Sequence, residues 1–147
     1  GAQDKIGTMS TVPAGFKPLP AASPFNELVG PLHEKRGERV VSLGLRVEKK
    51  HCNSRGICHG GVLATLADLG LGYGLMAKMG GARGGFVTAH LDLDYAGSAA
   101  LGDWIHSEVE VQRVGMRLAF ATGYLCVGER RIVRMSGIFA LPGRTAA

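Results

Sequence analysis

The chain has 147 residues, of which 46% are hydrophobic and 20% charged, so it suits one globular domain and leaves little room for a second. Its formal net charge of +5 fits an anionic small molecule as ligand. The Lys and Arg residues are scattered and are not interleaved with aromatic residues, which argues against nucleic acid as a partner. Three cysteines, Cys52, Cys58 and Cys126, are too few for a disulfide framework. Without a signal-like or membrane-spanning stretch, we expect a cytoplasmic protein with no membrane contact.

The N-terminal part is rich in Gly, Ala, Pro and Ser over residues 1–23, which predicts a flexible lead-in. A single domain is expected to follow over residues 24–143. Its first element is a short helix at about residues 24–29, because Ser23 can act as the N-cap and Pro24 can occupy the first helical position.

A long apolar helix follows a strand and a loop. Residues 38–50 predict a strand with weak alternation, and residues 51–59 form a polar loop. The helix over about residues 61–79 is apolar on every face, which is typical of a helix buried in a core. Gly80 and Gly81 end it.

Four strand-like segments follow this helix, and the short turns between them indicate an antiparallel meander. In the first segment apolar and polar residues alternate from Val87 to Tyr95, which assigns Thr88 to the polar face. A sheet that curls around one apolar helix would bury the whole helix, so we expect an α+β fold of this kind. The four segments are residues 86–95, 103–113, 116–127 and 131–141.

Asp68 is the only charged residue between Val62 and Ala77. An unpaired carboxylate in an apolar interior is very costly, so it must be paired, shifted in pKa, or placed at a cavity or interface. The alternative is a helix Asp that faces solvent or a basic partner. Because a solvent-facing side would carry more than one polar residue, we favour a functional carboxylate.

The start of the same helix carries His59, Gly60 and Gly61. Backbone N–H groups at a helix start lack helical partners and lie at the positive end of the dipole. Glycine lets a ligand approach them closely, so this segment could stabilise a developing oxyanion. By itself it fits a glycine-rich turn equally well. Asn53, just before it, can donate or accept hydrogen bonds, and alone it indicates a turn residue.

A metal site is a competing interpretation of the loop, since His51, Cys52, Cys58 and His59 offer four nitrogen or sulfur ligands. Zinc sites use ligand pairs separated by two to five residues, and adjacent side chains rarely converge on one ion. We therefore expect no metal here.

Together these residues resemble a known family. The segment from Asn53 to Asp68, NSRGICHGGVLATLAD, resembles the signature of hot-dog-fold acyl-CoA thioesterases of the phenylacetic acid degradation (PaaI-like) and 4-hydroxybenzoyl-CoA thioesterase family. In that signature an Asn lies six residues before His-Gly-Gly and an acid nine residues after the His, and both spacings match here. The resemblance runs from about Pro24 to Leu141. It implies an antiparallel sheet of about five or six strands wrapped around one long apolar helix.

The resemblance also implies an activity, the hydrolysis of an acyl-CoA, aryl or medium-chain, to the free acid and CoA. Asp68 would be the catalytic base or nucleophile, and the Gly60 N–H would polarise the thioester carbonyl. Asn53 and His59 would position the substrate or leaving group, and Thr88 would help to hold the attacking water. The CoA thioester is itself the substrate, so no separate cofactor is expected.

Three further residues are candidates for contacts to CoA. They are Gly61, beside the expected oxyanion site, and Arg113 and Arg117, which flank the turn at Gly115. The two arginines either contact the ligand phosphates or are ordinary charges of a solvated hairpin.

Family members are dimers, often paired into tetramers, and place two sites at the subunit interface. Each site would take Asn53 and Gly60 from one subunit and Asp68 and Thr88 from the other. Gly72, one turn after Asp68, is often Ser or Thr in relatives, so its missing side chain could widen the acyl pocket.

Two other functions are compatible with such a chain. One is a non-catalytic acyl-CoA binder or ligand sensor on the same fold. The other is a hot-dog hydratase or dehydratase, but those relatives use a paired His and acid in a motif that this sequence lacks. The intact Asp68 favours the enzyme.

Overall fold

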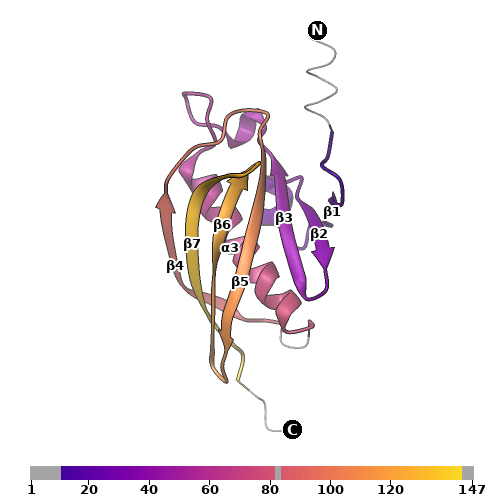
Figure 1. Ribbon diagram of the computed structural model, residues 1–147, viewed down its shortest axis with the longest axis vertical. Coiled ribbons are helices and arrows are strands. Elements are labelled where there is room, and N and C mark those ends of the chain that lie inside the picture. The colour runs from indigo at the N-terminus through magenta and orange to yellow at the C-terminus, as the bar shows by residue number, and fades with distance from the viewer. Residues whose placement is uncertain (1–10, 82–83, 144–147) are drawn as a thin grey trace.

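The computed structural model describes residues 11–81 and 84–143. A seven-stranded antiparallel sheet in the order β1-β2-β3-β5-β6-β7-β4 curves around one long helix, α3 (Gly60–Lys78), which lies behind the sheet in Figure 1. This confirms the predicted hot-dog architecture. The strands are β1 (Lys17–Pro18), β2 (His33–Gly37), β3 (Val40–Arg46), β4 (Val87–Tyr95), β5 (Trp104–Val114), β6 (Leu118–Val127) and β7 (Arg130–Ala140).

The sheet has more strands than the five or six that were predicted. The sequence of β2, HEKRG, lacks apolar alternation because three of its five residues are exposed near the sheet edge. Lys17–Pro18, within the expected lead-in, pairs with β2 as β1. The predicted strand over residues 38–50 is shorter, because Arg39 adopts a positive φ of 55° in the β2–β3 turn and Lys49–His51 forms a 3-10 helix, η1.

The other helices begin and end close to where they were predicted. In α2 (Pro24–Val29), the side chain of Ser23 caps the first turn by accepting a hydrogen bond from the Asn26 N–H at 3.1 Å. The long helix α3 begins at Gly60, directly after His59, and ends at Lys78. Its apolar composition marks a core helix, as the sequence indicated, but only seven of its 19 residues are buried in the described chain, so the expectation that the sheet would bury the whole helix is wrong.

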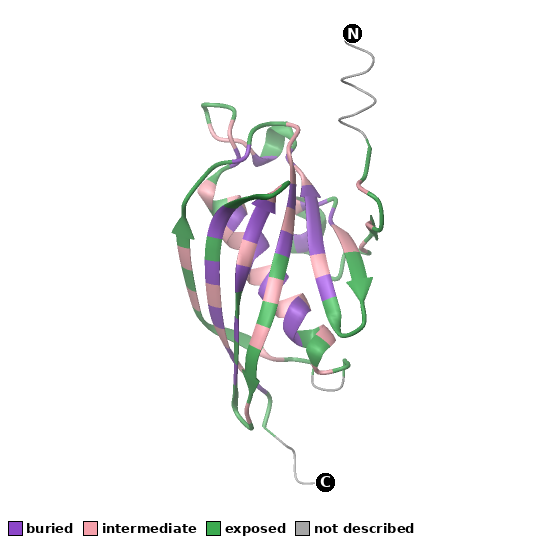
Figure 2. Ribbon diagram, in the orientation of Figure 1, coloured by how far each residue is buried: buried purple, intermediate pink, exposed green. Residues whose placement is uncertain are grey.

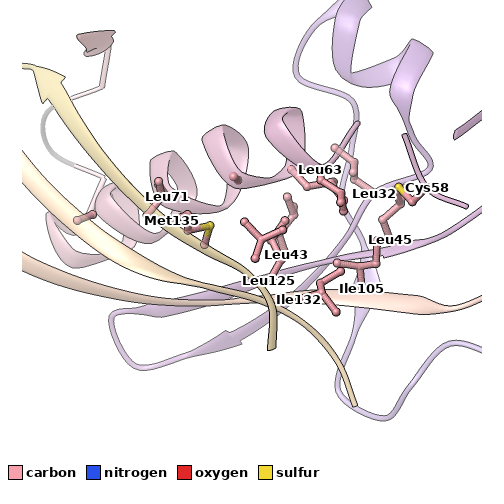
Figure 3. Packing of buried hydrophobic residues seen from close by; sticks show 14 of the residues in the cluster. Leu32, Leu43, Leu45, Cys58, Leu63, Leu71, Ile105, Leu125, Ile132 and Met135 are labelled. Atoms are coloured by element: carbon pink, nitrogen blue, oxygen red, sulfur yellow. The ribbon is translucent and has the colours of Figure 1, made fainter. Parts of the chain in front are cut away.

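The core lies between α3 and the concave face of the sheet. Figure 3 shows Leu63 and Leu71 of α3 directed toward strand residues such as Leu43 and Met135. Burial of such side chains contributes about 1.5–3 kcal/mol each. Among the described segments, α3 alone is long and apolar enough to span a membrane, by length and composition only. In this fold its apolar side chains pack against the sheet instead.

Two glycines let α3 approach β5 closely. A Cβ atom at Gly74 would lie 2.6 Å from Cγ1 of Val109, and one at Gly70 would lie 2.9 Å from Cβ of Ser107. Contacts that short do not occur between real side chains, so both positions require glycine at the present helix–sheet distance.

The last strand of the sheet, β4, pairs with β7, and within the described residues no strand lies along its other edge. Seven of its nine residues are exposed, and Figure 2 shows it as a largely exposed edge. Val87 and Tyr95, near its two ends, are 63% and 52% exposed. A long exposed edge with apolar residues is a surface that can pair with another strand.

Candidate active site

Asp68 lies beside β4 and is held by Thr88. The Thr88 Oγ1 hydroxyl donates a hydrogen bond of 2.6 Å to Asp68 Oδ1. Asp68 is half-buried, and within residues 11–81 and 84–143 no Lys, Arg or His forms an ion pair with it. A basic partner in the described chain therefore does not explain this carboxylate, which is positioned by a hydroxyl and accessible to a ligand.

A β-bulge turns Thr88 toward the helix. In the pairing with β7, Thr88 lies opposite Phe139 and His90 lies opposite Ile138, so Ala89 is the extra residue of β4. One extra residue reverses the face on which the preceding side chains lie. The alternation in the sequence grouped Thr88 with the polar residues His90, Asp92 and Asp94, and the bulge separates it from them.

The first turn of α3 has one free donor. The Gly61 N–H bonds to Nδ1 of His59 at 2.8 Å, and the N–H groups of Val62 and Leu63 bond to the His59 carbonyl. This leaves the Gly60 N–H without a partner in the part of the chain that the structure describes. Gly60 can therefore present its N–H to a carbonyl oxygen, whereas Gly61 cannot use its own N–H in this way.

His59 and Asn53 each accept hydrogen bonds from nearby backbone N–H groups and still have N–H groups that a ligand could reach. Because Nδ1 of His59 accepts the Gly61 hydrogen bond, the neutral ring carries its proton on Nε2, and the residue is exposed. The Asn53 Oδ1 accepts from the Arg55 N–H at 2.9 Å and the Ile57 N–H at 3.4 Å. Asn53 thus shapes the loop before α3 through its oxygen and keeps its NH2 group for other contacts.

Tyr95 is a residue of this region that the sequence analysis did not single out. Its hydroxyl donates a hydrogen bond of 2.8 Å to the Gly60 carbonyl. The bond joins the end of β4 to the start of α3, as the Thr88–Asp68 bond joins the start of β4 to the middle of α3. Its position at the end of the alternating strand was the only signal in the sequence.

Within one chain, Gly60 and Asp68 are too far apart to act on the same carbonyl. Eight residues of helix separate them, and at 1.5 Å per residue this corresponds to about 12 Å. A donor to an oxyanion must lie about 3 Å from the oxygen. Within one chain these two groups therefore cannot act together on one carbonyl.

The loop before α3 does not favour a metal or a cysteine nucleophile. His51 Nδ1 accepts the Glu48 N–H, and His51 Nε2 contacts the Val29 carbonyl, so neither ring nitrogen is free. Burial raises the pKa of the Cys58 thiol to about 12, which removes the thiolate at neutral pH.

Arg113 and Arg117 are exposed at the β5–β6 turn. Along the paired strands, Thr88 lies opposite Phe139, Phe139 opposite Ala119, and Ala119 opposite Val114. Three steps of about 4.8 Å put this turn about 14 Å from Thr88, at the same end of the sheet.

An antiparallel sheet curved around one apolar helix is the hot-dog architecture, which solved thioesterases share. The chain belongs to the thioesterase superfamily, whose sequence model matches residues 55–133. A Pseudomonas aeruginosa protein that is provisionally named an esterase is 44% identical over 135 residues, covering 91% of this chain and 100% of that one. Acyl-coenzyme A thioesterase 13 of Mus musculus is 35% identical over 78 residues, which cover 53% of this chain and 54% of that protein.

Solved structures agree with this assignment. The zebra fish thioesterase superfamily member 2 superposes with a TM-score of 0.73 at 28% identity, over 83% of this chain and 90% of that one. The PaaI protein of Escherichia coli shares the fold, with a TM-score of 0.72 at 17% identity over 83% and 86% of the two chains. The family and these names support thioester hydrolysis as the general class of activity.

Proposed function

We propose that this protein hydrolyses an acyl-CoA to the free acid and CoA, at a site shared between two copies of the chain. The observation that carries the proposal is the half-buried Asp68, held at 2.6 Å by Thr88 and without a basic partner in the described chain. The acyl-CoA class is supported by the name of the mouse relative and by the net charge of +5.

The exposed edge of β4 supports the shared site. If two β4 strands pair antiparallel about the middle of the strand, Val87 of one copy lies opposite Tyr95 of the partner subunit, and Thr88 is next to Val87. Thr88 is bonded to Asp68, and Tyr95 is bonded to Gly60. The pairing would therefore bring Asp68 of one copy beside Gly60 of the partner subunit, and would complete two sites per dimer.

In such a site the free Gly60 N–H would donate to the thioester oxygen as negative charge develops on it. Asp68 would either remove a proton from water that attacks the carbonyl carbon, or attack that carbon itself to form an anhydride that water then cleaves. In both routes the carbon–sulfur bond breaks and CoA leaves as the thiolate. The exposed His59 and the half-buried Asn53 would contact the substrate next to this carbonyl.

The acyl group would extend past Gly72, one turn beyond Asp68. A Cβ atom at Gly72 would lie 3.7 Å from the Phe86 ring, so a side chain could fit there and none is present. The space beside an aromatic ring suits an aryl or medium-chain acyl group.

The test is hydrolysis of aryl-, short-, medium- and long-chain acyl-CoAs, measured by release of the CoA thiol. Asp68→Ala and the isosteric Asp68→Asn should fold normally and lose about 10²–10⁴-fold in kcat, the scale of a positioned base. Near-normal turnover in either folded variant would overturn the assignment. A wild-type protein that binds acyl-CoA without turnover would instead identify a binding protein.

A mixing experiment tests the shared site. Asn53→Ala and Asp68→Ala should each be inactive alone, and hybrid dimers should regain activity because one of their two sites has both residues. Light scattering should show at least a dimer. An active monomer, or no recovery in hybrids that are shown to form, would refute a shared site.

A further inference from the structure

A second cluster of functional groups lies on β5 and β6, on the face of the sheet away from α3. Ile105 and Ser107 of β5 are buried, so the intervening His106 and Glu108 point to the opposite face. Cys126 of β6 is the residue paired directly with His106. The metal-binding atoms of His106, Glu108 and Cys126 all lie within 4.8 Å of one another.

The spacing of these atoms is close to that of a tetrahedral zinc site. Zn²⁺ bonds of about 2.0–2.1 Å to nitrogen and oxygen and about 2.3 Å to sulfur place N and O about 3.4 Å apart, and S about 3.6 Å from each. His106 Nε2 lies 3.6 Å from Glu108 Oε1. The distances from the Cys126 sulfur to the other two ligand atoms, at most 4.8 Å, would have to shorten by up to about 1.2 Å to complete the set.

The cluster is open to solvent on one side. β3 pairs with β5 through its backbone from Gly44 to Arg46, and beyond that point Ser107 joins the two strands through its side chain and its carbonyl. A groove of about 740 Å³ opens there, lined by His106 and Glu108 together with Phe16 and Trp104. The Glu108 side chain is 52% exposed and that of His106 is 24% exposed. An ion can therefore enter from the groove, next to His106 and Glu108, and bind the sulfur of the buried Cys126 on its inner side.

We propose that His106, Glu108 and Cys126 form a site for a divalent transition-metal ion, with Zn²⁺ as the best match. The set of one nitrogen, one oxygen and one sulfur suits Zn²⁺ and not the oxygen-preferring Mg²⁺ or Ca²⁺. Three protein ligands leave the fourth position to water or to a ligand from the groove. The site is separate from Asp68 and from the loop cysteines.

Binding requires loss of one proton. The ion forms a bond to the Cys126 sulfur as the S–H proton leaves to solvent, so binding should release a proton.

The experiment uses the chelator-treated full-length protein, Zn²⁺ in competition with a chromophoric chelator, and Co²⁺ as a spectroscopic probe. We expect one ion per chain, a thiolate-to-cobalt charge-transfer band, and a higher melting temperature with Zn²⁺. Cys126→Ser should abolish the band and weaken Zn²⁺ binding by at least about 100-fold. Loss of a residue that only supports a metal ligand lowers metal affinity by up to about 100-fold, and loss of a ligand itself should cost at least as much. His106→Gln, on the accessible side, should weaken it similarly without disturbing the buried thiol.

Two controls locate the site. Cys52→Ser should keep the cobalt band, which would exclude the loop cysteines, and Asp68→Ala should keep full Zn²⁺ affinity, which would separate the metal from the proposed hydrolysis. No stoichiometric binding by the wild type would overturn the proposal. So would a band that survives Cys126→Ser, or one that is lost in Cys52→Ser.

Discussion

Replacement of Thr88 by Val tests how the carboxylate is positioned. The change removes the hydroxyl that donates to Asp68 Oδ1 at 2.6 Å, and keeps the shape and the β-branched side chain. A hydrogen bond to a charged group contributes about 1.5–3 kcal/mol, and the accessible position of this one favours the lower half of that range. Since about 1.4 kcal/mol corresponds to a factor of ten, kcat/KM should fall about 10- to 100-fold.

The assay is the release of CoA from the best substrate of the wild type, with the melting temperature measured in parallel. Thr88→Ser keeps the hydroxyl and should stay within about threefold of the wild type. Thr88 is exposed, so neither variant should change the melting temperature by more than a few degrees. Equal activities of the Val and Ser variants, with both folded, would refute the role of this hydrogen bond.

Two further predictions concern CoA and the helix. Replacing Arg113 and Arg117 together by Ala should raise KM for acyl-CoA about 3- to 30-fold with little change in kcat, and this increase in KM should become smaller as the salt concentration rises. An unchanged KM at low salt would show that the two arginines are ordinary hairpin charges. Gly72→Ala should stabilise the protein by about 0.5–1 kcal/mol through helix propensity, because its Cβ would have an ordinary contact of 3.7 Å. Gly74→Ala should destabilise it by about 1–3 kcal/mol, because its Cβ would lie 2.6 Å from Val109. Urea titrations that shift both helix variants in the same direction would contradict this reasoning.

The long helix, the carboxylate of Asp68 within it and the glycines at its start could be predicted from the sequence, each for a physical reason. An apolar helix is expected in the core, and one face of α3 packs against the sheet, whereas its other residues stay at least partly exposed. A single carboxylate within it was expected to be paired, shifted in pKa, or placed at a cavity or interface, and Asp68 is half-buried and accepts a hydrogen bond from Thr88. The glycines after His59 predicted a helix start with an unused N–H, and in the described part of the chain the Gly60 N–H has no partner.

The parts that could not be predicted depend on pairing between strands. The charged β2 carries no apolar pattern, because sheet hydrogen bonds and not buried side chains hold it. The contact of Tyr95 with Gly60 joins residues 35 positions apart. The cluster of His106, Glu108 and Cys126 also becomes visible only when the register of β5 and β6 is known.

The bulge at Ala89 has a consequence for how β4 can evolve. Substituting Ala89 changes one exposed side chain and leaves the pairing with β7 as it is. Deleting it would restore regular pairing and rotate Thr88 to the outer face, away from Asp68. The strand should therefore accept many substitutions at this position but no change in length. A homologous chain with a gap here would have to hold its carboxylate by some other group.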